Sequence, residues 1–231
     1  MPDAAPPDAF RLTLVTVPCL TDNYAFLIHD EASGTTALID APQAGPIQAA
    51  LDARGWRLSD ILLTHHHDDH VQGLGPLRSG ARVIGAAADA HRLPPLDLAV
   101  KPGARLAVCG EEVQVIDVPG HTVGHMAYAI SDGGQTIINT GDLSHHHVLL
   151  LQRPNTRFFV EVGDEHSKRF GSTAEDIFRL FTDLGYTAYF VRLAPLSPRI
   201  KLNPAHAPKP SGLTYDVFFC KESLRQPNGR L

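Results

Sequence analysis

The densest set of chemically active side chains in this sequence is the stretch Thr64-His65-His66-His67-Asp68-Asp69-His70. It places four imidazoles and two carboxylates within seven residues. Neutral imidazole together with carboxylate suits zinc, and also iron or manganese, better than calcium or magnesium. So many unpaired histidines and acids also need a partner charge. The stretch therefore predicts a metal site, and the alternative is a solvated polar loop.

The position of this stretch follows from the apolar run Ile61-Leu62-Leu63 directly before it. Such a run predicts the end of a buried strand, with the histidines at the rim of a sheet. Alternate side chains of an extended backbone share a side. His65 and His67 can therefore bind one ion while His66 and Asp68 face elsewhere. Asp69 and His70 begin the next turn and can reach a second ion nearby.

Two more candidate residues follow predicted strands. Glu112 to Val118 alternates between polar and apolar residues and leads into His121, and a predicted hairpin over 126–140 ends in Gly141-Asp142. The glycine beside Asp142 permits a close approach of another chain segment. The alternatives are a core histidine bonded to a backbone carbonyl and an aspartate that caps a strand end.

The remaining elements are predicted from alternation, apolar spacing and punctuation by glycine and proline. The predicted strands are 11–17, 24–29, 35–39, 59–63, 82–85, 158–162, 187–193 and 215–220, and the predicted helices are 45–55, 71–77, 86–92 and 172–184. The polar loop Thr21-Asp22-Asn23 can be a turn with side-chain caps.

The stretch Thr64 to His70 resembles the signature of the metallo-β-lactamase superfamily. The segments Val17 to Tyr24, Ala37 to Asp40 and Pro119 to His125 are similar to glyoxalase II, the hydroxyacylglutathione hydrolases. The resemblance runs from about residue 12 to 142. It implies an α/β (α+β) fold, the αββα sandwich, with an atypical carboxyl-terminal portion and one or two metal ions. It also implies, as the alternative to a simple turn, that the loop Thr21-Asp22-Asn23 is a substrate-side loop.

The resemblance also implies roles for individual residues. His65, His67 and His121 would hold the first metal, Asp69 and His70 the second, and Asp142 would bridge the two, whereas His125 is a structural histidine. The last ligand of the second metal is open, because strand 187–193 ends in Ala194-Pro195 rather than in a histidine. His206 is the first candidate for this ligand and His166 the second. The triple His145 to His147 is a weaker metal-binding candidate.

The last third of the chain departs from this pattern. Residues 156–231, chiefly Glu161 to His166 and Tyr215 to Phe219, resemble the carboxyl end of FkbM family methyltransferases. No glycine-rich S-adenosylmethionine loop precedes them, so methyl transfer is not expected. We predict a metal-binding domain over residues 1–155. Residues 156–231 are either the second half of the sandwich or a fused segment.

Composition excludes several functional classes. With 231 residues, 43% of them hydrophobic, the chain can bury one sizeable core. Twenty basic and 25 acidic residues give a net charge of -5 without a basic block, so a nucleic-acid partner is not expected. Residues 1–8 resemble neither a signal peptide nor a membrane anchor. The cytoplasm is therefore the expected location. The three widely spaced cysteines Cys19, Cys109 and Cys220 are expected to be reduced and structural; among them, Cys19 lies nearest to the site loop.

The predicted function is therefore that of a metal-dependent hydrolase with a small-molecule substrate. A bound zinc ion, or iron or manganese, would supply a hydroxide nucleophile, with Asp69 as the catalytic residue that orients it or accepts a proton. The resemblance to glyoxalase II suggests a thioester or ester, such as an acylglutathione, as the preferred substrate. The alternatives are a lactonase or β-lactamase-like hydrolase on the same metals, and a non-catalytic metal-binding or chimeric protein. The oligomeric state is open.

Overall fold

The computed structural model describes residues 11–21, 23–119, 121–132, 135–142, 156–163, 173–183, 185–193, 200–205 and 214–220. The chain divides into two compact units, Met1–Gly141 and Asp142–Leu231. The domain boundary that we predicted at residue 155 stays a prediction, since residues 143–155 lie outside the described part. Each unit is considered by itself below.

The first unit contains a six-stranded sheet in the order β1-β2-β3-β4-β5-β6. Its strands are β1 (Thr13–Cys19), β2 (Asn23–Asp30), β3 (Thr35–Ile39), β4 (Leu58–Leu62), β5 (Arg82–Ala86) and β6 (Leu98–Val100). The first three strands pair antiparallel, and β3 to β6 pair parallel. Because parallel strands end at the same edge, the loops after β3 and β4 come together there.

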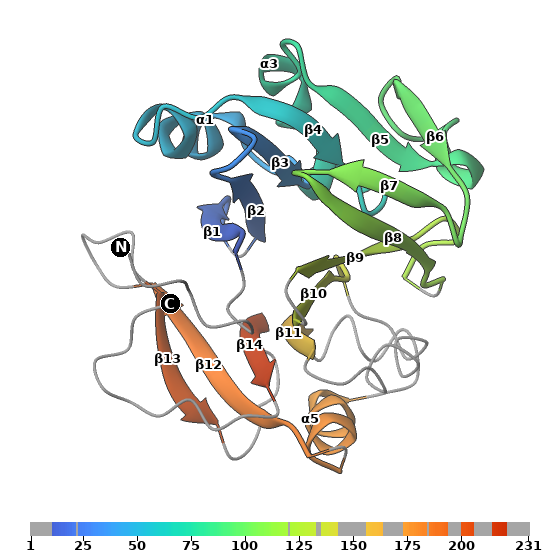
Figure 1. The fold of residues 1–231 in the computed structure, drawn as a ribbon. Coiled ribbons are helices and arrows are strands. Elements are labelled where there is room, and N and C mark those ends of the chain that lie inside the picture. Colours follow the sequence, from blue (N-terminus) through green and yellow to red (C-terminus); the bar gives the residue numbers. More distant parts are fainter. Residues whose placement is uncertain are drawn as a thin grey trace. The chain divides into compact units, whose positions relative to one another are not determined.

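Short helices cover one face of this sheet (Figure 1). They are α1 (Ala44–Asp52), α2 (Asp68–Val71) and α3 (Leu74–Leu77), with the 3-10 helix η1 (Ala87–Asp89) after β5. Ile47 and Leu51 of α1 and Leu74 of α3 pack in one buried cluster with Leu38 and Ile61 of the sheet. Burying this apolar face holds the helices in place, because helices this short are not stable alone.

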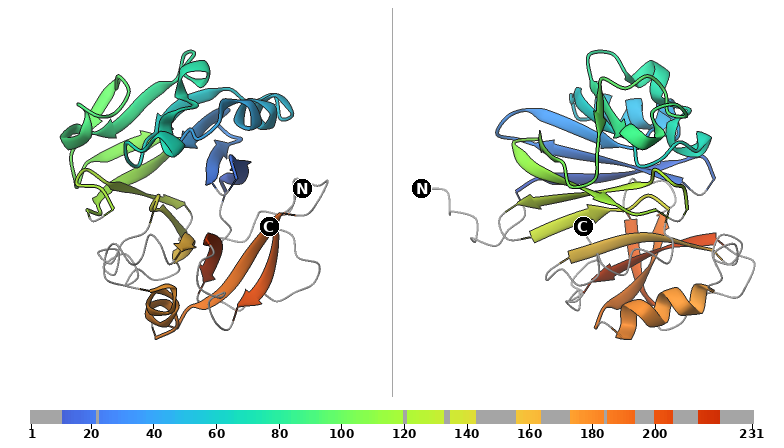
Figure 2. Two further views of the ribbon diagram at one scale, coloured as in Figure 1. Left: turned by 180° about the vertical axis from the view of Figure 1, so that it is seen from behind. Right: turned by 90° about the vertical axis from the view of Figure 1, so that its right-hand side faces the viewer.

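A second, antiparallel sheet covers the opposite face (Figure 2, right). Within the first unit its strands follow the order β10-β9-β8-β7. They are β7 (Arg105–Val108), β8 (Glu111–Asp117), β9 (Met126–Asp132) and β10 (Gln135–Asn139). Side chains from both sheets, among them Ile39, Leu62, Val113 and Tyr128, form the buried cluster between them. The first unit is thus a stack of helices, sheet and sheet.

The second unit contains four antiparallel strands in the order β13-β12-β14-β11, with helix α5 against β11 and β12. The elements are β11 (Thr156–Gly163), α5 (Ala174–Asp183), β12 (Thr187–Leu193), β13 (Ile200–Ala205) and β14 (Thr214–Cys220). Thr173 and Asp176 exchange hydrogen bonds at the start of α5, as in a capping box. Gly185, at φ +82°, ends the helix as predicted.

The structure departs from the predicted elements in a few places. The helix predicted from Val71 begins at Asp68, and it is divided because the N–H of Gly73 donates to the carbonyl of Ala41 (2.8 Å). A Cβ on Gly73 would lie 2.8 Å from that carbonyl oxygen. The helix predicted over 86–92 is only η1. Strands β6, β7 and β13 were not predicted, as they are short or contain proline.

Candidate metal centre

Four of the predicted ligands, His65, His67, His121 and Asp142, come together because each follows the end of a strand. Leu63 is the single residue between the end of β4 and the segment Thr64 to His70. Two hydrogen bonds of its backbone hold the start of this segment in place. The N–H of Leu63 donates to the carbonyl of Ile84 (2.9 Å), and its carbonyl accepts from the hydroxyl of Tyr128 (2.8 Å). Complete burial raises the pKa of Tyr128, so its hydroxyl remains a donor.

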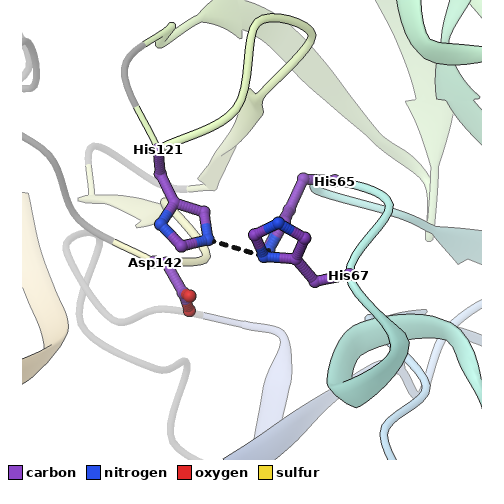
Figure 3. A group of neighbouring side chains, drawn as sticks. All are labelled: His65, His67, His121 and Asp142. Carbon is purple, nitrogen blue, oxygen red and sulfur yellow. Dashed lines mark hydrogen bonds between the residues drawn. The ribbon is translucent and has the colours of Figure 1, made fainter. Parts of the chain in front are cut away.

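Four of the predicted ligands form one group. The donor atoms of His65, His67, His121 and Asp142 all lie within 4.8 Å of one another. Figure 3 shows the imidazoles of His67 and His121 facing each other, with the carboxylate of Asp142 below them. His65 is fully buried and the other three are half-buried. The group is therefore shielded from solvent at His65 and accessible to solvent at the other three residues.

The nitrogen positions fit a metal ion of the zinc type. Nδ1 of His67 lies 3.1 Å from Nε2 of His65 and 2.8 Å from Nε2 of His121. Two nitrogen ligands of a tetrahedral zinc site are about 3.3 Å apart, given Zn–N bonds of roughly 2.0–2.1 Å. The observed distances are within about half an ångström of that value, so small side-chain movements would admit the ion.

Hydrogen bonds behind the group fix the tautomer of His65. The hydroxyl of Thr64 donates to the carboxylate of Asp40 (2.7 Å), which can only accept. Thr64 Oγ1 is therefore the acceptor in its 3.0 Å contact with Nδ1 of His65. With the proton on Nδ1, Nε2 carries the lone pair and faces His67. Such support from the second layer of residues tunes metal ligands.

The same carboxylate orients His70. Asp40 accepts from Nδ1 of His70 (2.9 Å), so Nε2 of this buried histidine is the ring nitrogen left for the predicted metal. Nε2 lies 3.8 Å from Oδ2 of Asp69. Asp69 and His70 thus form a pair beside the four-residue group, and the rings of His65 and His70 are 4.2 Å apart. This is the pair that we predicted for a second metal.

As predicted from the alternation of side chains, His66 and Asp68 do not belong to the four-residue group. His66 turns away from the group and contacts Asp89 of η1, with Nδ1 2.8 Å from Oδ2, and Asp68 is exposed. Asp89 is fully buried, and a Cβ on Gly124 would lie 2.7 Å from its Cβ. Asp89 therefore links the loop of His65 and His67 to the loop that follows His121.

Sequence reasoning missed the support residues Asp40 and Asp89. Asp40 takes a left-handed backbone, φ +57°, which aspartate tolerates better than most residues. In the sequence, only its place in the segment Ala37 to Asp40, which is similar to glyoxalase II, pointed to Asp40. Gly141 also has φ +57°, and a Cβ there would lie 2.6 Å from Thr64 Oγ1 and 2.7 Å from His125 Nε2. The close approach expected at this glycine is thus made to Thr64 and His125.

Cys19 is not placed to act as a nucleophile. Its side chain is buried, and this burial raises the pKa of the thiol to about 11. The thiol therefore stays protonated near neutral pH, which agrees with a structural role. Cys109 is buried in the same way, with its pKa also raised to about 11.

Several predicted residues lie outside the described part of the chain. They are His206 and His166, the two candidates for the last ligand, together with His145 to His147 and Asp22. The choice between His206 and His166 therefore remains a prediction. His125 is described and fully buried, and it contributes no donor atom to the four-residue group.

The fold and the histidine-aspartate group agree with the family to which the chain belongs. A profile described as the metallo-beta-lactamase superfamily matches residues 21–184. This protein is therefore a member of the metallo-beta-lactamase superfamily, and the predicted fold class is confirmed. The match includes β11 and α5. The resemblance of residues 156–231 to FkbM methyltransferases stays a prediction.

Within the superfamily, the chain is similar in sequence to hydroxyacylglutathione hydrolases. The chain is 62% identical over 133 residues to a hydroxyacylglutathione hydrolase of Cereibacter sphaeroides (strain ATCC 17025 / ATH 2.4.3). The aligned region covers 57% of this chain and 51% of the relative. The chain is 61% identical over 133 residues to the hydroxyacylglutathione hydrolase of Fuscovulum blasticum, with the same shares covered. The chain thus spans about half the length of the curated relatives it matches.

A solved structure supports the fold alone. The crystal structure of BLEG-1, a B3 metallo-beta-lactamase, superimposes with a TM-score of 0.51 at 18% identity, covering 56% of this chain and 72% of that chain. At this identity the likeness concerns the arrangement of sheets and helices, and it carries no statement about substrate.

Proposed function

We propose that this protein is a metal-dependent hydrolase that cleaves the thioester of an acylglutathione-like substrate. The observation that carries the proposal is the convergence of His65 Nε2, His67 Nδ1 and His121 Nε2, with neighbouring contacts of 3.1 and 2.8 Å. The substrate class is proposed from the names of relatives that share about 60% identity with the matched half.

The proposed roles follow from the positions of the donor atoms. The three histidines of the group would hold the first ion, Asp69 and His70 a second, and Asp142 would be shared, with His206 or His166 as the last ligand. Zinc is the preferred metal, and iron or manganese also suit these ligands. A bound ion of this kind acidifies a water molecule and polarises the carbonyl of the substrate.

Asp69 is the proposed catalytic residue. Its side chain is 48% exposed, in contrast to that of His70 (7%), so it can reach solvent and substrate. A carboxylate there can orient the attacking water and accept its proton. The reaction then needs no serine or cysteine nucleophile, in agreement with the protonated thiol of Cys19.

The free thiols of the described residues carry the proposal for the compartment. None of the helices in the described ranges is long and apolar enough to cross a membrane. Cys19 and Cys109 are free thiols, which is usual in a reducing compartment such as the cytoplasm. We therefore keep the cytoplasm as the proposed location.

The experiment that tests this function combines metal analysis with a substrate panel. Wild-type protein should carry zinc or iron and hydrolyse an acylglutathione in preference to a lactone or a β-lactam. His67→Ala should lose most of both metal and activity, because its Nδ1 lies between the two other nitrogens. His91→Ala is the matched control, since His91 is exposed and outside the group.

Each alternative has its own outcome. Bound metal without hydrolysis of any panel member would favour a non-catalytic protein. Faster turnover of the lactone would favour a lactonase. Unchanged metal content in His67→Ala would contradict the proposed ligand set itself.

A further inference from the structure

Asn23 joins the polar loop after β1 to the metal-binding segment. Its side-chain Nδ2 donates to Oδ2 of Asp69 (3.1 Å) and, more weakly, to the backbone carbonyl of Asp69 (3.4 Å). A side-chain amide carries two N–H groups, so it can make both contacts at once. Asn23 thereby holds the backbone and the carboxylate of the same residue.

Asn23 is fixed in a buried strand, whereas the side chain of Asp69 is partly exposed on a short helix. Asn23 is the first residue of β2, pairs in register with Cys19 of β1, and is 7% exposed. Asp69 lies in the four-residue helix α2, and its side chain is 48% exposed. An exposed side chain of this kind has several accessible rotamers, and fixing one of them costs conformational entropy. A rigid donor on a strand can set that rotamer in advance.

We propose that Asn23 is a positioning residue that holds the carboxylate of Asp69 beside His70 Nε2 before a second metal ion binds. This inference rests on the proposed function, because it assumes that Asp69 and His70 are ligands. Oδ2 of Asp69 accepts from Asn23 and lies 3.8 Å from Nε2 of His70. A carboxylate oxygen has a second lone pair, which stays available for a cation.

The geometry argues against the other expected role of Asn23, that of a substrate contact on its loop. Its amide donates to Asp69 at both contacts, and little of the residue is exposed. The loop itself has a separate anchor, because the N–H of Leu20 donates to Oε1 of Gln43 (2.9 Å). This separation allows the loop anchor and the Asp69 contact to be removed independently.

The test is a zinc titration of metal-stripped protein, comparing the two equivalents of bound zinc. Asn23→Ala should weaken the equivalent that involves Asp69 by about 10- to 100-fold, the usual effect of removing a group that orients a metal ligand. The three-histidine equivalent should be unchanged. Asn23→Leu, which keeps the number and branching of the side-chain heavy atoms but has no donor, should give the same result if Asn23→Ala does not fold.

Two further variants separate the possible outcomes. Gln43→Ala removes the loop anchor without touching Asp69, and it should leave both equivalents unchanged. Asp69→Ala should abolish the equivalent that involves Asp69 and His70. If Asp69→Ala does so while Asn23→Ala and Asn23→Leu bind zinc like the wild type, the positioning role is wrong and the ligand set stands. If Asp69→Ala retains both equivalents, the proposed second site is wrong, and the role of Asn23 with it.

Discussion

Replacing Gly141 by alanine should destabilise the first unit and weaken metal binding together. Gly141 has φ +57°, and an added Cβ would lie 2.6 Å from Thr64 Oγ1 and 2.9 Å from Thr64 Cβ. Contacts under 3.0 Å require atoms to move. Thr64 has little freedom to do so, since it is fully buried and bonded to Asp40 through both its N–H and its hydroxyl.

The expected loss of folding stability in Gly141→Ala has two contributions. The left-handed backbone costs a non-glycine residue roughly 1–2 kcal/mol. Inserting a methyl group into a closely packed region costs roughly 1–3 kcal/mol more. The expected loss for Gly141→Ala is therefore about 2–5 kcal/mol, a large share of the roughly 5–15 kcal/mol that stabilises a typical domain.

Gly34→Ala is the matched control. Gly34 also has a left-handed backbone, φ +67°, but its added Cβ meets no described atom within 4 Å. It should show only the backbone cost of roughly 1–2 kcal/mol. The difference between the two variants then isolates the crowding against Thr64 and His125.

The assay is urea unfolding of metal-stripped protein, followed by fluorescence. Trp56 is the only tryptophan of the chain and lies in the first unit, so its signal reports on that unit. Metal is removed because a bound ligand would add its own stabilisation. Zinc affinity is measured separately, and only Gly141→Ala should lower it, because Thr64 supports His65. Equal free energies of unfolding for the two variants would refute the crowding argument.

Three further predictions concern the site and the thiols. Asp69→Asn should fold normally but lose most thioester hydrolysis, because an amide cannot accept a proton as a carboxylate does; full activity would contradict the role of Asp69. His206→Ala should weaken only the zinc equivalent that involves Asp69 and His70, whereas an unchanged titration in both His206→Ala and His166→Ala would point to another ligand. Alkylation of Cys19 and Cys109 in the folded protein, mapped by mass spectrometry, should be slow at pH 8 and accelerate toward pH 11. Burial raises both pKa values to about 11, so the thiolate forms only at high pH; rates at pH 8 equal to those in urea would contradict this.

Most of the local structure was predictable from the sequence, because it depends on residues close together in the chain. The alternation of His65 and His67, the stop at Gly185 and the cap formed by Thr173 each need only a few neighbouring residues. The strand ends before His121 and Asp142 were also visible, since apolar periodicity stops there. These local signals placed the candidate ligands at the ends of strands.

The start of α2 and the shortest strands were not predictable in this way. α2 begins at Asp68, inside a stretch whose side chains gave no helical periodicity. β6 has three residues and β7 four, too few to show an alternating pattern. Their pairing with longer neighbours holds them in the sheets.

The sequence by itself determined which side chains can bind a metal and that they follow strand ends. Only the tertiary structure decided what holds them. Asp40 bonds to Thr64 and His70 across 24 and 30 residues of chain, and Asn23 reaches Asp69 across 46. Such contacts depend on which strands are neighbours and in what register they pair, and neither is encoded in a short segment. The candidate ligands are therefore a property of local sequence, whereas their tautomers and orientations are set by the packing of distant loops at one edge of the sheet.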